Sequence, residues 1–380
     1  MKIKSRLPDL GTSIFSIMSK MATENNAINL SQGFPDFKVS EKLIELIHQQ
    51  MKAGHNQYAP MPGVPALRET IANVIDQTYQ HQVDPESEIT VTAGGTEAIF
   101  ASIAGLVSQG DEVILFDPSY DCYDPAIRLN GGIPIHINLN PPQFSIDWEE
   151  VKGKITSRTK MIMINTPQNP SGAVLTESDL KVLETIVNEH DILVLSDEVY
   201  ERIIFDGLTH QSVLRFPNLA SRSIAIFSFG KTFHATGWKV GYAVAPKEIT
   251  NEIRKAHQFI TFSVNTPVQM ALAEYMKDSS HYTRLSAFYQ IKRDFFLDQI
   301  KGSSFEPMAC HGSYFQLLSY QAISQKGDIE MAEWLTKQYK LAAIPISVFY
   351  KDKTDNLLLR FCFAKGEETL KKAGEILNQL

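Results

Sequence analysis

The sequence predicts an α/β fold with a largely parallel central sheet flanked by helices, and a smaller α+β domain built from both chain ends. Two observations lead to this prediction. Short runs rich in Val, Ile and Phe are apolar at consecutive positions, as in strands that are buried on both faces of a parallel sheet. These runs alternate with stretches of helical pattern, which implies βα units joined by right-handed crossovers.

Six apolar runs in the middle of the chain are predicted strands. They span residues 88–95 (EITVTAGG), 111–120 (DEVILFDPSY), 160–170 (KMIMINTPQNP), 192–200 (ILVLSDEVY), 223–231 (SIAIFSFGK) and 240–246 (VGYAVAP). Residues 176–190 are predicted to form a helix, because Thr176 stands three residues before Asp179 in the spacing of a capping box. Residues 248–278 are predicted to form two helices that meet near Pro267.

The two ends of the chain have a different pattern. Residues 310–318, 341–349 and 356–363 are predicted to contain shorter strands, separated by amphipathic helices such as residues 367–380. We therefore expect an N-terminal arm with part of a small domain in residues 1–45, a large domain in residues 46–280, and a C-terminal small domain in residues 281–380.

Composition narrows the classes of function. The 380 residues carry a net charge of −7 and contain no Lys/Arg run longer than a pair, which argues against binding to a nucleic-acid backbone. No stretch approaches the roughly 18 apolar residues of a membrane span, the N-terminus lacks the apolar segment of a signal peptide, and the histidines show no metal-binding spacing. The three cysteines are far apart and form no CxxC pattern, so we expect a cytoplasmic protein in a reducing compartment.

Polar residues and glycines follow almost every predicted strand. Because the carboxyl ends of parallel strands share one edge, and ligands of such sheets bind outside that edge, we expect these segments to converge on one site. The segments are Gly94–Thr96, Asp117–Tyr120, Asn165–Asn169, Ser196–Glu198 and Ser228–Lys231.

Three charged residues in or next to apolar runs suggest chemistry. A desolvated Lys231 would have a lowered pKa and could bond to the carbonyl of a cofactor, although a solvated lysine is the ordinary alternative. Asp197 follows an apolar run, so its carboxylate needs a cationic or hydrogen-bonding partner. That partner is either the protonated ring nitrogen of a ligand or a structural group of the protein. Glu198, the next residue, is an alternative candidate for binding such a ring nitrogen. Arg360 lies inside an apolar run and requires an anion, from a substrate or from a nearby glutamate.

A candidate phosphate site follows the first predicted strand. Gly95 and Thr96 begin a predicted helix, whose N-terminal N–H groups can bind a phosphate, and Ser228 and Lys239 are suited to assist. The segment has neither the GxxxxGK[ST] nor the GxGxxG pattern, so nucleotide hydrolysis is not indicated.

The segment NTPQNPSG and the residue Tyr200 carry further hydrogen-bonding groups. Asn169 and Tyr200 could bind a phenolic oxygen of a ligand. Asn165 and Asn169 could instead cap turns, because the segment is rich in turn-forming residues.

Taken together, these segments resemble the class I aminotransferases, which are pyridoxal 5′-phosphate (PLP) enzymes of fold type I. The resemblance covers essentially the whole chain and rests, in order, on INLSQGFPDF, NQYAPMPGVPALRE, VTAGGTEAI, FDPSYDCY, NTPQNPSG, SDEVYE, SFGKTFHATGWKVG, HGSYF and RFCFAK. Within the family, LSQGFPDF and RFCFAK are similar to bacterial methionine aminotransferases and to the kynurenine aminotransferase/glutamine transaminase K group. The resemblance implies that residues 46–280 form the PLP-binding domain.

The resemblance also implies roles for individual residues. Lys231 would hold the cofactor and move the substrate proton, Asp197 would pair with the ring nitrogen, and Tyr200 would hold the ring oxygen. The implied cofactor-binding set is Gly95, Thr96, Tyr120, Asn165, Asn169, Asp197, Tyr200, Ser228, Lys231, Lys239 and, from the other subunit of a homodimer, Tyr58. The implied substrate-binding set is Phe15, Gly33, Tyr123, Asn169, Tyr314 and Arg360.

The implied reaction moves the amino group of an amino acid to a 2-oxo acid by a ping-pong mechanism. The aromatic residues Phe15, Tyr123 and Tyr314, with no evident second arginine for a distal carboxylate, favour methionine, aromatic amino acids or glutamine over aspartate as donors. One rival is a kynurenine aminotransferase or cysteine-S-conjugate β-lyase on the same scaffold. A second rival, a cofactor-binding regulator, would need an added DNA-binding segment, which we do not expect because the chain starts almost at once with the family's N-terminal arm.

Overall fold

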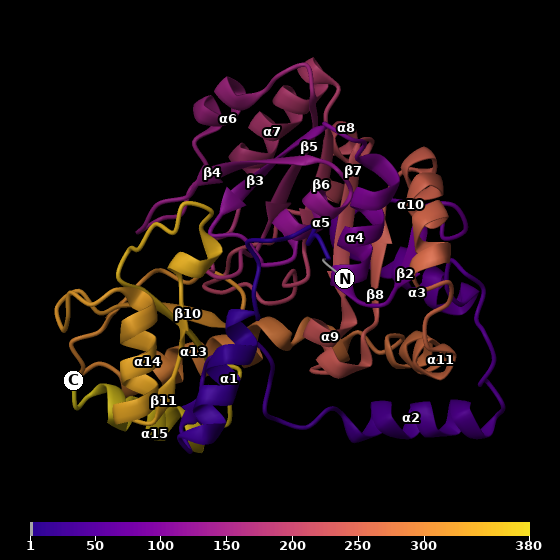
Figure 1. The fold of residues 1–380 in the computed structure, drawn as a ribbon. Helices are drawn as coiled ribbons and strands as arrows, with labels where there is room; N and C mark the ends of the chain where they lie inside the picture. Colours follow the sequence, from indigo (N-terminus) through magenta and orange to yellow (C-terminus); the bar gives the residue numbers. More distant parts are fainter. Residues whose placement is uncertain (1–2) are drawn as a thin grey trace.

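A seven-stranded sheet forms the centre of the molecule. The computed structural model describes residues 3–380 (Figure 1). In spatial order the strands are β2 (Ile89–Thr92), β8 (Gly241–Val244), β7 (Ser223–Ser228), β6 (Leu193–Asp197), β5 (Thr159–Asn165), β3 (Glu112–Asp117) and β4 (Ile133–Asn138). Among these strands, β8 alone runs antiparallel to its neighbours, so the prediction of a largely parallel α/β sheet is confirmed.

In the seven-stranded sheet, the strand that the apolar pattern did not predict is β4. It lies at the edge of the sheet and pairs with β3. Its sequence, IPIHIN, contains Pro134 and His136, and most of its residues are only half-buried. Because unbroken apolar runs mark strands that are covered on both faces, an edge strand of this kind has no such signal.

Side chains of the central strands point alternately into two apolar layers. Val113 and Leu115 of β3 join one layer with α4 (Gly95–Leu106), α5 (Tyr123–Leu129) and α10 (Lys247–Ile260). Ile114 and Phe116 join the other layer with α3 (Pro65–Tyr79) and α7 (Glu177–His190). Figure 1 shows helices on both sides of the sheet. This double coverage explains why the strands are apolar at consecutive positions.

Two predictions about helices are confirmed. Helix α7 begins with a capping box, in which the Asp179 N–H donates to the Thr176 hydroxyl and the Thr176 N–H donates to the Asp179 carboxylate. Helices α10 and α11 (Thr266–Tyr275) are separate. Pro267 stands in the first turn of α11, where its missing N–H leaves no helical hydrogen bond unmade.

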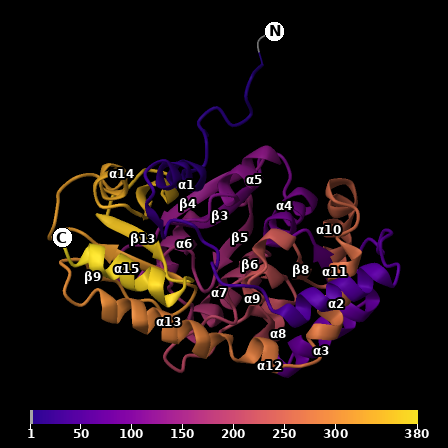
Figure 2. The same ribbon diagram turned by 90° about the horizontal axis from the view of Figure 1, so that it is seen from below.

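The two ends of the chain meet in smaller sheets. β1 (Ile28–Asn29) pairs in parallel with β11 (Leu341–Ala342). An antiparallel sheet has the order β12 (Ile344–Pro345), β13 (Leu358–Cys362), β10 (Phe315–Ser319) and β9 (Glu306–Pro307). Helix α1 (Ile14–Glu24) packs against α14 (Asp328–Gln338), as Figures 1 and 2 show. The domain boundaries at residues 45 and 280 stay a prediction.

The remaining helices are short or lie outside the sheet layers. They are α2 (Glu41–Lys52), α6 (Trp148–Lys154), α8 (Pro217–Ala220), α9 (Phe229–Thr232), α12 (Ser280–Thr283), α13 (Leu285–Gln299) and α15 (Glu367–Leu377). The segment before α1 is attached to α5 by an ion pair between Asp9 and Arg128, and it extends away from the rest of the chain in Figure 2. Within residues 3–380 no helix combines the length and the apolar character needed to cross a membrane.

Candidate active site

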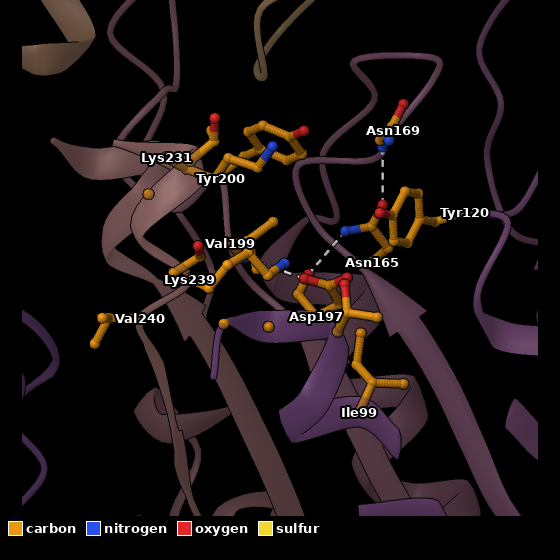
Figure 3. Close-up of a pocket in the computed structure, with 16 residues that line it drawn as sticks. Ile99, Tyr120, Asn165, Asn169, Asp197, Val199, Tyr200, Lys231, Lys239 and Val240 are labelled. Carbon is orange, nitrogen blue, oxygen red and sulfur yellow. Dashed lines mark hydrogen bonds between the residues drawn. The ribbon is translucent and has the colours of Figure 1, made fainter. Parts of the chain in front are cut away.

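A cavity lies at the carboxyl ends of β5, β6 and β7, at the edge where the strand-end residues were expected to converge. It holds about 660 Å³ of empty space, part of which is open to solvent. Ten residues named from the sequence line it: Gly95, Thr96, Tyr120, Asn165, Asn169, Asp197, Tyr200, Ser228, Lys231 and Lys239 (Figure 3). The fold therefore brings together groups that follow five different strands.

Lys231 projects into this cavity from α9, the short helix that follows β7 (Figure 3). Its Nζ donates to the hydroxyl of Tyr314 at 3.0 Å. Burial lowers the pKa of the amine to about 8, although the charge of Asp197 opposes this change. An appreciable fraction of the amine is therefore neutral near physiological pH, and the neutral amine is the nucleophilic form.

Asp197 is the last residue of β6 and is 4% exposed. Its Oδ2 accepts from the Tyr123 hydroxyl at 2.6 Å, and its Oδ1 accepts from the Val199 N–H at 3.3 Å. Burial nevertheless raises the pKa of this carboxyl to about 6. Among residues 3–380 no cationic side chain forms an ion pair with it, so a cationic group of a ligand would stabilise its charge.

Glu198, the competing carboxylate, is directed elsewhere. It is fully buried, its Oε2 lies 2.8 Å from His210 Nε2, and its Oε1 accepts from the Ser196 hydroxyl and the Val213 N–H. With these partners Glu198 is a structural group, and it does not line the cavity. Asp197 is the carboxylate that faces the site.

One end of the cavity offers donors for an anion. Helix α4 begins at Gly95, directly after Gly94, whose φ of +84° is readily adopted by glycine. Thr96 and Ser228 add hydroxyl groups, and a Cβ placed on Gly94 would lie 3.4 Å from Lys239 Nζ, so the ammonium group borders the start of the helix. Backbone N–H groups at a helix start, together with a lysine, bind phosphate well.

The two asparagines of NTPQNPSG connect different parts of the site. Asn165 Nδ2 donates to the carbonyl of Asp197 at 2.9 Å, and Asn165 Oδ1 accepts from the Asn169 N–H at 2.8 Å. Asn165 therefore stabilises the loop through a hydrogen bond to its backbone, in agreement with the alternative that this residue caps a turn. Tyr120 and Tyr200 face the same cavity, and burial raises the pKa of both hydroxyls, which keeps them protonated as hydrogen-bond donors.

Arg360 is 1% exposed in β13. Its Nη1 donates to Asn169 Oδ1 at 2.9 Å and its Nη2 donates to the Ser31 carbonyl at 3.0 Å, whereas its Nε has no hydrogen-bond partner in the part of the chain that the structure describes. The guanidinium lies 3.9 Å from the centre of the Phe315 ring. Within residues 3–380 no carboxylate forms an ion pair with Arg360, so the alternative of a structural glutamate partner is wrong. The buried guanidinium is therefore available to the anionic group of a ligand.

The comparison with known families matches residues 25–377 to the family described as aminotransferase class I and II. The chain belongs to this family. The match spans the large sheet, the cavity residues and both smaller sheets. It confirms the aminotransferase resemblance that was inferred from the motifs.

Individual aminotransferases agree with this assignment. The chain is 50% identical over 378 residues to the methionine aminotransferase of Escherichia coli (strain K12), covering 99% of this chain and 98% of the relative. The crystal structure of E. coli YbdL, described with a methionine aminotransferase function, superposes with a TM-score of 0.98 at 50% identity and covers 100% of both chains. Human kynurenine–oxoglutarate transaminase 1 is 33% identical over 395 residues, covering 95% of this chain and 94% of that protein.

Two tyrosines that were expected to contact the substrate have hydroxyls that bind other groups of the site. Tyr123 is 3% exposed and its hydroxyl is bound to Asp197. Tyr314 is fully buried, and its hydroxyl is bound to Lys231 and to the carbonyl of Gly33. Neither side chain lines this cavity, but Tyr123 lines a second cavity that shares Tyr120, Asn165 and Asn169 with it, and direct contact of the two tyrosines with substrate stays a prediction.

Phe15 and Tyr58 lie outside the cavity lining of the single chain. The Phe15 ring lies 5.2 Å from the Arg360 guanidinium and 5.8 Å from the Phe349 ring. Tyr58 is 82% exposed and packs edge-on against the exposed ring of Phe262 at 5.5 Å. The expected contact of Tyr58 with a second subunit stays a prediction.

Several cavity residues of this aminotransferase were not named from the sequence. Val199 lies between Asp197 and Tyr200 in the chain, so its neighbours could have indicated it, and Thr236 lies in the turn that follows Lys231. The others are Ile99 and Val240, whereas Gly94 and Gly230 belong to segments that were expected to converge on the site. Apolar wall residues carry no chemical signal in a sequence, and only the fold reveals them.

Proposed function

We propose that this aminotransferase works with PLP bound in the cavity at the ends of β5, β6 and β7. The start of α4, with Ser228 and Lys239, offers donors that fit the phosphate. Asp197 is a buried carboxylate without a cationic partner, which fits a protonated ring nitrogen. When bound, PLP supplies an electron sink for the electrons that remain after a bond to the substrate Cα breaks.

Lys231 has two tasks in this proposal. The first task is to attach the cofactor, which the amine can do because its pKa of about 8 lets it lose a proton near physiological pH. The second task is to accept and return the α-proton of the substrate once the amine is released from the cofactor. Tyr200 and Asn169 would hold the ring oxygen, and Tyr120 would lie against the ring. The placement of Lys231 and the buried Asp197 in the lining of one cavity is the observation that carries the proposal.

Arg360 binds the α-carboxylate of the substrate, with Asn169 and the backbone of Gly33 assisting. An amino acid and a 2-oxo acid both carry this carboxylate, and a guanidinium can grip it with two parallel hydrogen bonds. Because one buried cation serves both substrates, they bind in turn at the same place, which gives ping-pong kinetics. The existing bond from Arg360 to Asn169 already holds the guanidinium toward the cavity.

Methionine is the preferred donor that we propose, with aromatic amino acids and glutamine as further donors. The support is the 50% identity to the E. coli methionine aminotransferase over nearly the whole of both chains. Phe15 and Phe349, which flank Arg360, suit an apolar side chain, and a flexible thioether makes favourable contacts with aromatic rings. A panel of donors with one fixed 2-oxo acid and purified protein with PLP tests the proposal.

Kynurenine transamination, with cysteine-S-conjugate β-lyase activity, is the second candidate. It is favoured by the 33% identity to human kynurenine–oxoglutarate transaminase 1. Loss of the α-proton is common to both reactions, and a good leaving group on Cβ then diverts the substrate to elimination. Formation of pyruvate from a cysteine conjugate without an added 2-oxo acid would reveal the lyase activity.

A homodimer with composite sites completes the proposal. Tyr58 lies on an exposed loop next to Phe262, and Phe259 is 87% exposed nearby in the sequence, which leaves an apolar surface uncovered in the single chain. Tyr58 would reach the phosphate bound by the second subunit. Residues 1–45 and 281–380 would form a small domain beside the PLP-binding domain of residues 46–280.

We propose a cytoplasmic location for the enzyme. Its three cysteines are free, and Cys310 and Cys362 are buried, as expected for a reducing compartment. Fractionation of the cells that make the protein, with an antibody as the readout, tests this location.

A further inference from the structure

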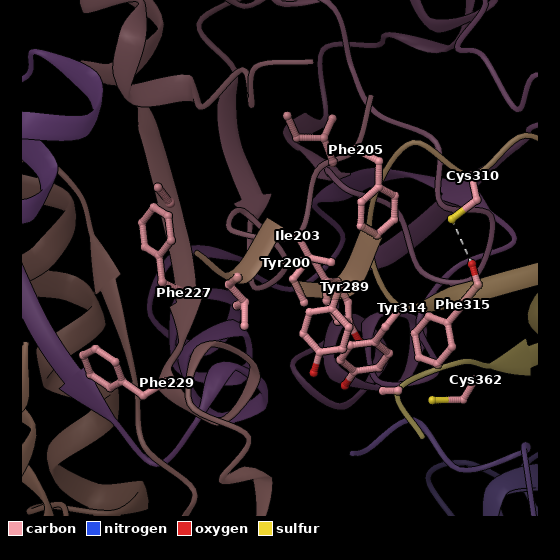
Figure 4. Packing of buried hydrophobic residues seen from close by; sticks show 14 of the residues in the cluster. Tyr200, Ile203, Phe205, Phe227, Phe229, Tyr289, Cys310, Tyr314, Phe315 and Cys362 are labelled. Carbon is pink, nitrogen blue, oxygen red and sulfur yellow. Dashed lines mark hydrogen bonds between the residues drawn. The ribbon is translucent and has the colours of Figure 1, made fainter. Parts of the chain in front are cut away.

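Tyr314 occupies an unusual position beside the reactive lysine. It is fully buried just before β10, and Figure 4 shows its ring packed beside those of Tyr200 and Tyr289. Its Oη lies 3.0 Å from Lys231 Nζ and 2.7 Å from the carbonyl oxygen of Gly33. The Tyr314 hydroxyl therefore connects Lys231 to a backbone segment that lies almost 200 residues before Lys231 in the sequence.

The chemistry of the three groups fixes the direction of both hydrogen bonds. A carbonyl oxygen only accepts, so Tyr314 gives its single hydroxyl proton to Gly33. Toward Lys231 the hydroxyl can then only accept, so one N–H of the amine points at Tyr314 whether the amine is charged or neutral. In the neutral amine, the lone pair must therefore point elsewhere.

The Gly33 end of the bridge is fixed as well. A Cβ on Gly33 would lie 2.9 Å from the Phe315 ring, so the backbone is packed closely against that ring. Two residues away, the Ser31 carbonyl accepts from Arg360 Nη2 at 3.0 Å. Two carbonyl groups of the segment Ser31–Gly33 thus take part in the site. The Ser31 carbonyl contacts the guanidinium directly, and the Gly33 carbonyl is connected to Lys231 through Tyr314.

We propose that Tyr314 is a positioning residue: it holds one N–H of Lys231 so that the lone pair of the neutral amine faces the cavity, and it ties the lysine to the segment that also holds Arg360. This proposal rests on the proposed role of Lys231, and it differs from a contact of Tyr314 with substrate. The amine and the carboxylate-binding cation are then held at a set separation by one backbone segment.

The test measures Lys231 in the apoprotein, without turnover. Trace acetylation over a range of pH, with mass spectrometry of the peptide that contains Lys231, gives the apparent pKa of the amine. A hydrogen bond from a charged donor is roughly twice as strong as one from a neutral donor. Tyr314→Phe, which removes the acceptor, should therefore lower the apparent pKa by about one pH unit.

Tyr289→Phe is the matched control. Tyr289 is also fully buried, its ring lies 5.6 Å from that of Tyr314, and its hydroxyl has no hydrogen-bond partner among residues 3–380. Removing that hydroxyl should leave the pKa of Lys231 unchanged. The groups whose charge acts on Lys231, namely Asp197, Arg360, Lys239 and Cys362, are the same in both variants.

The outcome separates the two proposals. Equal Lys231 pKa values in wild type, Tyr314→Phe and Tyr289→Phe would overturn the positioning role. If Lys231 of these proteins still attaches the cofactor normally, the proposed function remains intact. If Tyr314→Phe does not fold, 3-fluorotyrosine at position 314 replaces it. Its weaker acceptor oxygen should produce a smaller downward shift, and an unchanged pKa again overturns the proposal.

Discussion

Replacing Asp197 by asparagine should make the apoprotein more stable while it abolishes catalysis. Asp197 is 4% exposed, and burial raises the pKa of its carboxyl from 3.8 to about 6. Asparagine has the same shape and can keep both hydrogen bonds, because its Oδ1 accepts from the Val199 N–H and its Nδ2 donates to the Tyr123 hydroxyl. The substitution therefore removes a buried charge and little else.

The size of the effect follows from the two pKa values. A rise of roughly two pKa units corresponds to about 3 kcal/mol. Between the unfolded and folded pKa values the folded chain binds more protons than the unfolded chain, so the stability of the wild type falls as pH rises from about 4 through about 6. The stabilisation by Asp197→Asn should be below about 1 kcal/mol at pH 4 and approach about 3 kcal/mol at pH 8.

Urea unfolding of the two apoproteins at several pH values measures this difference. Both chains are compared at equal concentration, because the apparent stability of an oligomer depends on concentration. Glu198→Gln is the matched control: this neighbouring carboxylate is partnered by His210, so its loss should destabilise the protein. In the enzyme loaded with cofactor, Asp197→Asn should lower kcat by orders of magnitude.

Two results would refute this reasoning. Equal stability of wild type and Asp197→Asn at pH 8 would mean that the charge of Asp197 is compensated in the apoprotein. Normal turnover by the variant would mean that the negative charge is not needed at the ring nitrogen. Stability and turnover are measured separately, so each result identifies the step of the argument that fails.

Three further predictions concern the lysine, the assembly and the donor. Lys231→Ala should lose the pH-dependent absorbance of the attached cofactor and nearly all turnover; full activity would contradict its role. Analytical ultracentrifugation at the assay concentration should find a homodimer, because Tyr58 is proposed to complete the site of the second subunit, and a fully active monomer would disprove composite sites. In kcat/KM measured with one fixed 2-oxo acid, methionine should exceed aspartate, because a buried distal carboxylate would lack a cation. Phenylalanine, tyrosine, glutamine and kynurenine should also react, since apolar pockets discriminate by only roughly 1–3 kcal/mol per methylene-sized difference. If aspartate is the better donor, the pocket must contain a cation that we have not identified.

The parts of the fold that were predictable are those with a local cause. The central strands are apolar at consecutive positions because both faces of the sheet are covered, and Thr176 and Asp179 form their capping box within one turn. The convergence of strand ends follows from parallel pairing alone. Strand β4 lacked such a cause in its own sequence, since an edge strand with Pro134 and His136 has no unbroken apolar run.

Hydroxyl directions in the site could not be predicted in this way. The sequence does not tell whether Tyr123 faces a substrate or Asp197, because the contact joins residues 74 positions apart. Which of Asp197 and Glu198 faces the cavity likewise depends on His210. This residue follows β6 in the sequence, and its Nε2 lies next to the Glu198 carboxylate in the fold. Adjacent residues of a strand end face opposite sides, and distant partners decide which one lines the cavity.

The bond between Arg360 and the carbonyl of Ser31 joins residues that are 329 positions apart. It therefore bears on the order in which the enzyme matures during synthesis. Lys231 and Asp197 leave the ribosome long before β13, so an unfinished chain can carry both groups and still lack Arg360, the proposed partner of the substrate carboxylate. Closing so long a loop is also slow. A chain that ends before β13 would keep the lysine and the aspartate but lack the arginine that is proposed to bind the substrate carboxylate.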